Sequence, residues 1–312
     1  MKFSIITPSF NMETWVAETI ESVLSQEGDF EIEYILSDGG STDKTVTIFE
    51  DYKTRLERGD IAIKCKGIVM RTYSEKDKGT FDAINKGFGR ATGDLYSWCD
   101  ADNIYMPGAF EGLRKIFESD NEIQWVKGYS STMDEAGNLL YIKQGGIYRQ
   151  DWLKDCVYGM ESYFVAADTV FYTSNLWKQV GPIPDHFRCS GELWLWRELA
   201  KKTPLWSANL HVTRYRKRSG GLSRNIANCK KEQWEIRPKR TWRAWSARLF
   251  FSPQSRLYPR GEKFFLSLYP LLFMWGKRQE YFDFENGVVV KKPAKTFIVG
   301  ENPSYKDITK NL

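Results

Sequence analysis

The first half of the chain alternates between short apolar runs and longer amphipathic stretches. Apolar runs at residues 3–7, 31–37 and 68–73 have the length and composition of buried β-strands. Over residues 16–24 and 46–56, apolar residues recur about every 3.6 positions, which predicts helices with one buried face. Alternating strands and helices are typical of a mostly parallel sheet with helices on both faces. We therefore predict an α/β fold.

Polar, turn-forming residues follow the ends of these strands. Residues 8–9 follow the first strand, and residues 38–40 follow the second. The stretch 94–103 opens like a buried strand and ends in Asp100 and Asp102. Because ligands of parallel sheets bind beyond the carboxyl ends of the strands, we expect these three ends to line one crevice.

Asp100 and Asp102 form a pair of carboxylates one residue apart. Strand geometry would place both side chains on the same face of the chain. Such oxygens suit a hard divalent cation, Mn²⁺ or Mg²⁺, which keeps positions open for phosphate oxygens. A solvated acidic turn after a strand could have the same sequence, so the assignment depends on the rest of the chain.

The second half of the chain predicts further strands, one long helix and a C-terminal extension. The expected strands are residues 123–129, 138–148, 168–172 and 205–215. The helix, residues 191–202, begins with Glu192, which could act as a general base or simply interact favourably with the helix dipole. Beyond residue 225 the chain is rich in Trp and Arg, and we expect an amphipathic, helical extension there.

Composition limits the partners and the compartment. The 312 residues carry a net charge of +5, with Lys and Arg concentrated over residues 214–260, which favours an anionic partner such as phosphate, acidic lipid or nucleic acid. Five cysteines without C-x-x-C spacing, together with two histidines, exclude a zinc site and favour a reducing compartment. The sequence opens without a signal-peptide pattern, and its longest apolar run is short for a bilayer span. We therefore expect a soluble or peripheral protein.

Several single residues have both a functional and a structural interpretation. Asp38 could bind a nucleobase or ribose, or could cap its own turn. Lys78, Arg216 and Arg218 could bind phosphates, or could be solvated surface residues. Trp194 could stack on a sugar or pack in the core. No G-x-G-x-x-G or Walker lysine motif is present, so neither a common dinucleotide fold nor a P-loop is supported.

Taken in order, these stretches resemble family 2 glycosyltransferases, a large inverting family with a GT-A fold. The matching segments are 4–11 (SIITPSFN), 37–43 (SDGGSTD), 74–79 (SEKDKG), 82–87 (DAINKG), 91–94 (ATGD) and 100–102 (DAD). Residues 191–200 look like part of the acceptor-side half of the family, and residues 216–223 like its closing basic loop. The resemblance spans about residues 3–223.

The resemblance implies a division of the chain into a catalytic domain and an extension. The GT-A domain would occupy residues 1–224, with a nucleotide-sugar half at 1–103 and an acceptor half at 104–224. Residues 225–312 would be the C-terminal amphipathic, basic extension. Its Trp242 and Trp245, interleaved with arginines, could lie in a membrane interface, pack on the catalytic domain or form a dimer contact.

The resemblance also implies roles for individual residues. The implied donor-site residues are Thr7, Pro8, Asp38, Lys78, Asp100 and Ala101. Asp102, with Asp100, would hold the divalent metal, and Glu192 would be the base that deprotonates the acceptor hydroxyl. Contacts to the diphosphate or the acceptor are implied for Asn85, Trp194, Arg216 and Arg218.

Two departures from the family pattern bear on the chemistry. The base motif often carries Asp where this chain has Glu192, which is one methylene longer. Many relatives carry His near the position of Arg218, and an arginine cannot ligate a metal. Contact between this loop and a diphosphate would therefore have to be ionic.

The expected activity is transfer of a sugar from a UDP, GDP or dTDP donor to a hydroxyl of a saccharide or lipid-linked saccharide. The resemblance implies a metal-assisted inverting displacement in glycan or bacterial surface polysaccharide assembly, with no nucleic-acid partner. We expect a cytoplasmic protein that could lie at the inner face of the plasma membrane. A sugar-phosphate nucleotidyltransferase is disfavoured because residues 8–11 are not a glycine-rich basic loop. A non-catalytic sugar-nucleotide-binding subunit is the other alternative.

Overall fold

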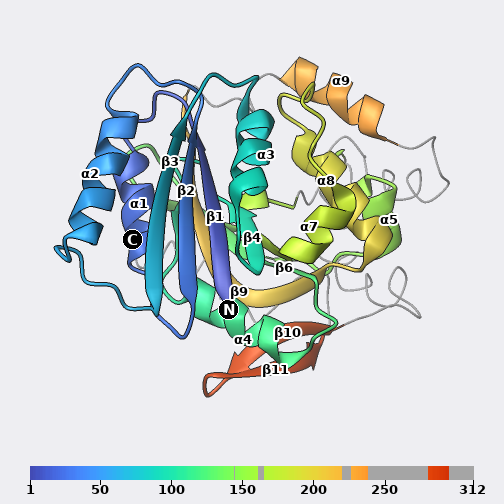
Figure 1. The fold of residues 1–312 in the computed structure, drawn as a ribbon. Helices are drawn as coiled ribbons and strands as arrows, with labels where there is room; N and C mark the ends of the chain where they lie inside the picture. Colours follow the sequence, from blue (N-terminus) through green and yellow to red (C-terminus); the bar gives the residue numbers. More distant parts are fainter. Residues whose placement is uncertain (144, 161–164, 220–225, 238–279, 295–312) are drawn as a thin grey trace.

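The computed structural model describes residues 1–143, 145–160, 165–219, 226–237 and 280–294. One mixed sheet runs through the molecule, with helices packed on its two faces (Figure 1). In sheet order its strands are β11 (Val288–Pro293), β10 (Glu280–Glu285), β9 (Trp206–Arg216), β6 (Trp125–Met133), β8 (Val170–Thr173), β4 (Leu95–Trp98), β1 (Lys2–Ser9), β2 (Glu31–Asp38) and β3 (Gly67–Ser74). Two short strands, β5 (Ile104–Tyr105) and β7 (Leu139–Lys143), pair with β9 and β6.

Strands β1 to β4 form the parallel half of the sheet. β1 pairs in parallel with both β2 and β4, and β2 pairs in parallel with β3. β8 is antiparallel to β4 and to β6, whereas β6 and β9 are parallel to each other. The predicted α/β class with a mostly parallel sheet is confirmed, and all four strands of the first half start and end close to the predicted positions.

The helices divide into two layers, each with its own hydrophobic core. The layer that includes α3 packs against aromatic residues of β4, and its members are α3 (Thr80–Arg90), α5 (Gln150–Lys154), α6 (Val157–Met160), α7 (Ser174–Val180), α8 (Gly191–Lys202) and α9 (Ile226–Ile236). The other layer contains α1 (Val16–Leu24), α2 (Thr45–Glu57) and α4 (Ala109–Ser119). Figure 1 shows α1 and α2 on the opposite side of the parallel strands from α3.

The packing of α3 on β1 shows how tightly these layers meet. A Cβ atom added to Gly87 would lie 2.5 Å from a methyl carbon of Ile6, so only glycine lets the helix approach the strand this closely. The ring of the next residue, Phe88, stacks on Tyr96 with 5.1 Å between centroids. The loop before α3 is thereby held over the carboxyl ends of the strands.

The C-terminal region differs from the helical extension that we predicted. Residues Ile226–Ile236 do form a helix, but Glu280–Pro293 form a hairpin, and Phe282 of this hairpin pairs with Ala208 of β9. The turn of the hairpin is Asn286-Gly287, and both residues have positive φ. Asn-Gly between two β-rich runs is a strong hairpin signal, which the helical prediction overlooked. Trp242 and Trp245 lie outside the described residues.

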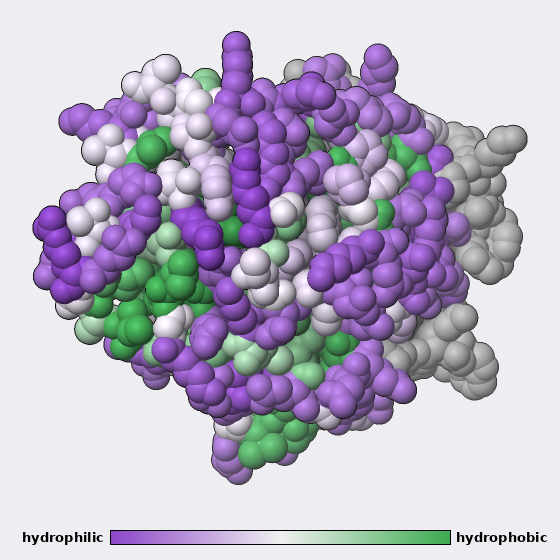
Figure 2. All heavy atoms as spheres, in the orientation of Figure 1, coloured by the Kyte–Doolittle hydropathy of each residue, from purple (hydrophilic) through white to green (hydrophobic). Residues whose placement is uncertain are grey.

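The visible surface is largely hydrophilic. Figure 2 shows apolar areas over the hairpin of β10 and β11 and over the edge strand β3. Val288 of the hairpin and Val69 of β3 are exposed apolar residues in these elements. None of the helices in the described part of the chain has the length and apolar character needed to span a bilayer.

Candidate active site

The carboxyl ends of β1, β2 and β3 meet at Asp38. The sheet register aligns Ser9, Asp38 and Ser74, and the Oγ atoms of both serines donate hydrogen bonds to the Asp38 carboxylate at 2.9 and 2.7 Å. The carboxylate also accepts bonds from the backbone nitrogens of Gly40 and Ser41 at 3.0 and 2.8 Å. Burial would raise the pKa of Asp38, but these hydrogen bonds lower it below its ordinary value. Asp38 thus caps its own turn as an ionised group.

The loops after β1 and β2 are also joined directly. The backbone nitrogen of Asn11 donates to Ser41 Oγ at 2.8 Å, and Asn11 Oδ1 accepts from the backbone nitrogen of Thr42 at 2.9 Å. Asn11 has a φ of 53° and binds the loop after β2, whereas helix α1 begins at Val16 without a side-chain cap. Nearby, a Cβ atom on Gly39 would lie 2.5 Å from Asp77 Oδ2, so a larger residue there would require the Asp77 side chain to move.

Thr7 and Pro8 are buried beneath these loops. Thr7 Oγ1 lies 3.2 Å from the hydroxyl oxygen of Tyr34, inside the sheet. Both residues therefore shape the base of the crevice, and their predicted contact with a nucleobase stays a prediction.

Asp100 and Asp102 follow β4 at the same edge of the sheet. Burial, followed by repulsion from Asp102 and Asp168, raises the pKa of Asp100 to about 7. Burial also raises the pKa of Asp102, although the nearby Arg218 opposes this change. Ala101 between them is buried. Asp102 is thus buried and Asp100 half-buried, so the pair is not a freely solvated acidic turn.

Arg218 lies on the carboxylate of Asp102. Its Nε donates a hydrogen bond to Asp102 Oδ2, and its guanidinium lies over the ring of Trp15, 4.8 Å from the ring centre. The Asp102 side chain is 8% exposed and the Arg218 side chain is 24% exposed. The structure thus brings Arg218 to the strand end that carries Asp102, while its predicted contact with a diphosphate stays a prediction.

Arg216 has a different position from the one we predicted. It is buried, and its guanidinium donates to the carbonyl oxygens of Asp102 and Glu135 at 3.1 and 2.8 Å and to the carboxylate of Glu18 at 2.6 Å. Its backbone nitrogen donates to Asn103 Oδ1 at 2.9 Å. Arg216 thus supports the segment behind Asp102, and its guanidinium is occupied by protein oxygens instead of facing a diphosphate.

The described part of the chain contains no ready-made cluster of metal ligands at this edge of the sheet. Among the described residues, no three His, Cys, Asp or Glu side chains are grouped closely enough to hold a metal ion. The two histidines of the chain lie elsewhere, because His186 pairs with Glu235 at 2.7 Å and His211 contacts Ser131 at 3.0 Å. The divalent metal stays a prediction, and the cation found at Asp102 is Arg218.

Lys78, Asn85 and Trp194 each contact other parts of the protein. Lys78 Nζ lies 2.5 Å from the carboxylate of Asp185, on the surface. The side chain of Asn85 exchanges two hydrogen bonds with the backbone of Ile183, at 2.7 and 2.9 Å. Trp194 packs against the hydrophobic core. These contacts favour structural roles, and the predicted ligand contacts of the three residues are untested.

Glu192 lies in the first turn of α8, a helix whose predicted bounds are confirmed. Its side chain is half-buried. Gly191 before it packs so closely that a Cβ atom would lie 2.7 Å from side-chain carbons of Ile183 and Phe81. Tight packing therefore fixes the backbone that carries Glu192, while its role as the base stays a prediction.

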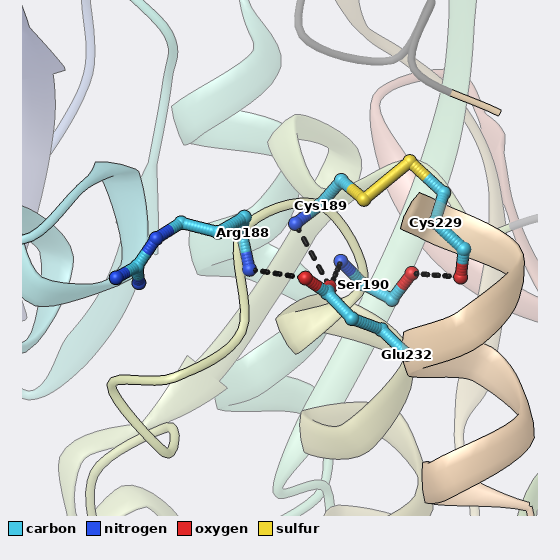
Figure 3. The surroundings of a disulfide bond; sticks show 5 residues. All are labelled: Arg188, Cys189, Ser190, Cys229 and Glu232. Carbon is cyan, nitrogen blue, oxygen red and sulfur yellow. Dashed lines mark hydrogen bonds between the residues drawn. A yellow bond between two sulfur atoms is a disulfide. The ribbon is translucent and has the colours of Figure 1, made fainter. Parts of the chain in front are cut away.

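Helix α9 holds the segment before α8 in a clamp formed by Glu232, Cys229 and their partners (Figure 3). The carboxylate of Glu232 accepts hydrogen bonds from the backbone nitrogens of Arg188, Cys189 and Ser190 at 2.8, 3.0 and 2.9 Å. A disulfide joins Cys189 to Cys229, and Ser190 Oγ donates to the carbonyl oxygen of Cys229 at 3.2 Å. This bond differs from our expectation of a reducing compartment, because disulfides are rare there.

Sequence reasoning overlooked three residues that shape the site. Asp168 is buried before β8, with Oδ2 3.4 Å from Asn103 Nδ2, and its charge raises the pKa of Asp100. Trp15 supplies the aromatic face beneath Arg218, and Glu232 anchors the start of α8. No motif marks any of the three, because each acts through a partner that is distant in the sequence.

Comparisons with known proteins agree with this geometry. The fold and the strand-end carboxylates define a GT-A type glycosyltransferase domain. Residues 4–169 match the model of glycosyl transferase family 2, so the chain belongs to this family. It is 26% identical over 195 residues to an uncharacterized glycosyltransferase of Rickettsia typhi, covering 62% of this chain and 57% of that protein.

Two other relatives are considerably longer proteins. The chain is 31% identical to the minor teichoic acid biosynthesis protein GgaB of Bacillus subtilis over 126 residues, which are 40% of this chain and 13% of GgaB. It is 29% identical to hyaluronan synthase of Streptococcus pyogenes over 140 residues, which are 45% of this chain and 32% of the synthase. The chain thus matches 57% or less of the length of these three relatives.

A solved structure shows the same fold. Residues 1–349 of S. aureus TarS, in complex with UDP-GlcNAc, superpose with a TM-score of 0.56 at 14% identity, covering 97% of this chain and all of that one. At this identity the likeness establishes the GT-A fold and no more.

Proposed function

We propose that this protein transfers a sugar from a nucleoside-diphosphate donor to a hydroxyl group of a saccharide or lipid-linked saccharide acceptor. Membership of glycosyl transferase family 2 supports the reaction class. The observation that carries the donor site is the convergence of Asp38, Asp100 and Asp102 at the carboxyl ends of parallel strands, with Arg218 on Asp102. A UDP donor is the first to test, because the TarS structure contains UDP-GlcNAc.

The proposed chemistry is a single displacement at the anomeric carbon. The acceptor oxygen forms a bond to that carbon while the bond from the carbon to the diphosphate oxygen breaks. The acceptor proton passes to Glu192, and the departing nucleoside diphosphate keeps the electron pair. A positive charge at Asp102 is needed to stabilise this leaving group, and the expected sources are the predicted divalent metal or Arg218. The sugar inverts its anomeric configuration.

The setting of the reaction is part of the proposal. We propose a role in glycan or bacterial surface polysaccharide assembly, which the relation to GgaB and hyaluronan synthase supports. The proposed location is the cytoplasm or the inner face of the plasma membrane. A disulfide such as Cys189–Cys229 is rare in the cytoplasm.

Titration calorimetry followed by a turnover assay tests this function. UDP, GDP and dTDP are titrated into the full chain, with ADP as the control nucleotide. The nucleoside diphosphate released from the matching nucleotide sugar is then measured with water or monosaccharide glycosides as acceptors. We expect one of the three nucleotides to bind. We expect Glu192→Gln to retain that binding but to lose roughly 10²- to 10⁴-fold in turnover, as is typical when a general base is removed.

Glu198→Gln is the matched control on the same helix, because Glu198 pairs with Lys201 on the surface. It should leave both binding and turnover unchanged. Full turnover of Glu192→Gln would remove the assigned base. Failure of all three nucleotides to bind well-folded protein would contradict the donor site itself.

A further inference from the structure

Arg218 bridges two segments that follow parallel strands. Its Nε donates a hydrogen bond to Asp102, which follows β4. Its guanidinium lies 4.8 Å from the ring centre of Trp15, which lies between β1 and α1. A carboxylate at one edge and an aromatic face below therefore hold the cation in a defined orientation. This orientation places a permanent positive charge at the donor end of the fold.

The hydrogen-bonding capacity of Arg218 is only partly used. Within the described residues, its Nε donates to Asp102, and neither terminal nitrogen has an acceptor. Arg216, two residues earlier, donates to protein oxygens through Nε and both terminal nitrogens. The guanidinium of Arg218 thus keeps the pair of amino groups that bind phosphate oxygens side by side.

A pocket of about 420 Å³ borders this side chain. Residues 217–219 form one wall, and residues 134–136 with Leu140 form the other. The Arg218 side chain is 24% exposed, whereas that of Asp102 is 8% exposed. A ligand that enters from solvent therefore reaches the guanidinium before the carboxylate.

A divalent cation at Asp102 would have to share the carboxylate with Arg218, whose Nε already donates to Oδ2. Asp102 is largely buried, and separating a buried ion pair leaves an uncompensated charge. Arg216 also fixes the backbone of Asp102 through its carbonyl oxygen, which restricts rearrangement around an ion. Neither histidine of the chain serves as a further ligand, because His186 contacts Glu235 and His211 contacts Ser131.

We propose that Arg218 holds the diphosphate of the donor, and that the donor binds without a divalent metal. This inference rests on the proposed function of the site. Asp102 orients the guanidinium, and the terminal nitrogens donate hydrogen bonds to the diphosphate oxygens. When the bond to the sugar breaks, the same guanidinium stabilises the charge on the departing nucleoside diphosphate. Asp102 thereby becomes a positioning residue instead of a metal ligand.

The test compares binding of UDP, GDP and dTDP to the wild-type chain in EDTA and in Mn²⁺. We expect the nucleotide that binds to show affinities within about threefold of each other in the two conditions, because no step requires the metal. Binding that disappears in EDTA and returns with Mn²⁺ would overturn this inference while leaving the proposed function intact. Failure to bind in either condition would overturn both. This comparison needs no variant, so it does not depend on how a substituted chain folds.

Variants at Arg218 sharpen the result. In EDTA, Arg218→Gln should bind roughly ten- to a hundredfold more weakly, the range expected when hydrogen bonds to a charged group are lost. Arg218→His should bind weakly in EDTA and recover with Mn²⁺, because imidazole and Asp102 together can ligate the ion. Arg90→Gln is the matched control, since Arg90 also pairs with a carboxylate and covers an aromatic ring. Unchanged binding by Arg218→Gln would contradict the proposal.

Discussion

Asp38 shows how one carboxylate can organise three loops. It accepts hydrogen bonds from Ser9 and Ser74, the last residues of β1 and β3, and from Ser41, which follows β2. Both interpretations of Asp38 from the sequence, the turn cap and the nucleobase ligand, require the same residue at the same place. The structure shows the cap, because the register of the sheet, which the sequence does not specify, brings the two flanking serines to it.

We predict that Asp38→Asn lowers the free energy of unfolding by roughly 1–3 kcal/mol, because buried donors lose a charged acceptor. The pKa of Asp38 is lower in the folded chain than its ordinary value of 3.8, so its stabilising contribution is present above that pH. The contribution disappears as the pH falls through the lower folded pKa. Urea unfolding from neutral pH down to pH values below 3.8 measures this difference. A constant difference across the range would contradict the assignment, and Asp60→Asn, at an exposed position, is the control.

Arg216 and Arg218 illustrate the limit of sequence reasoning at single residues. The resemblance implies that the basic loop contacts the donor diphosphate, and the structure places Arg218 on the carboxylate of Asp102. The resemblance does not predict which arginine is buried, because that depends on β9 continuing through Arg216 and aligning it with Met133 of β6. Strand β9 therefore buries Arg216, and Arg218 lies beside the carboxylate of Asp102.

At the scale of elements, periodicity predicted the first half of the chain well. Helices α1 and α2 and strands β1 to β4 lie where the apolar positions indicate. Strands β1, β2 and β4 bury their apolar runs as predicted, whereas the edge strand β3 buries only Met70. The C-terminal hairpin was missed despite its Asn-Gly turn, because the abundance of Trp and Arg was interpreted as an amphipathic helix. The clamp between α8 and α9 had no local signal at all, since its cysteines are 40 residues apart.

The clamp leads to a prediction about the first turn of α8. Glu232→Ala should speed amide hydrogen exchange at Arg188, Cys189 and Ser190 by roughly ten- to a hundredfold, because three backbone donors lose their common acceptor. Exchange mass spectrometry of the oxidised chain measures this change. Glu235→Ala, on the same helix but paired with His186 at the surface, should leave these amides unchanged. Equal exchange in the two variants would show that Glu232 does not anchor the segment.

At the scale of the whole molecule, the sequence predicts the convergence of strand ends because parallel strands share one direction. Asp38, Asp100 and Asp102 therefore come to one edge, as we predicted. The sequence could not predict the surroundings of these carboxylates: the half-buried position of Asp100, the nearby Asp168 and the guanidinium on Asp102. These depend on contacts across more than 60 residues of chain, which no motif contains.

The most direct test of the account is a crystal structure of the full chain with the nucleoside diphosphate selected by calorimetry, grown in EDTA. We predict that the diphosphate lies beside Asp102 and accepts hydrogen bonds from the terminal nitrogens of Arg218, with the nucleoside over the loops that Asp38 connects. A nucleotide bound elsewhere would contradict the donor site. A nucleotide in the predicted place with Arg218 turned away from its diphosphate would contradict the role of this arginine.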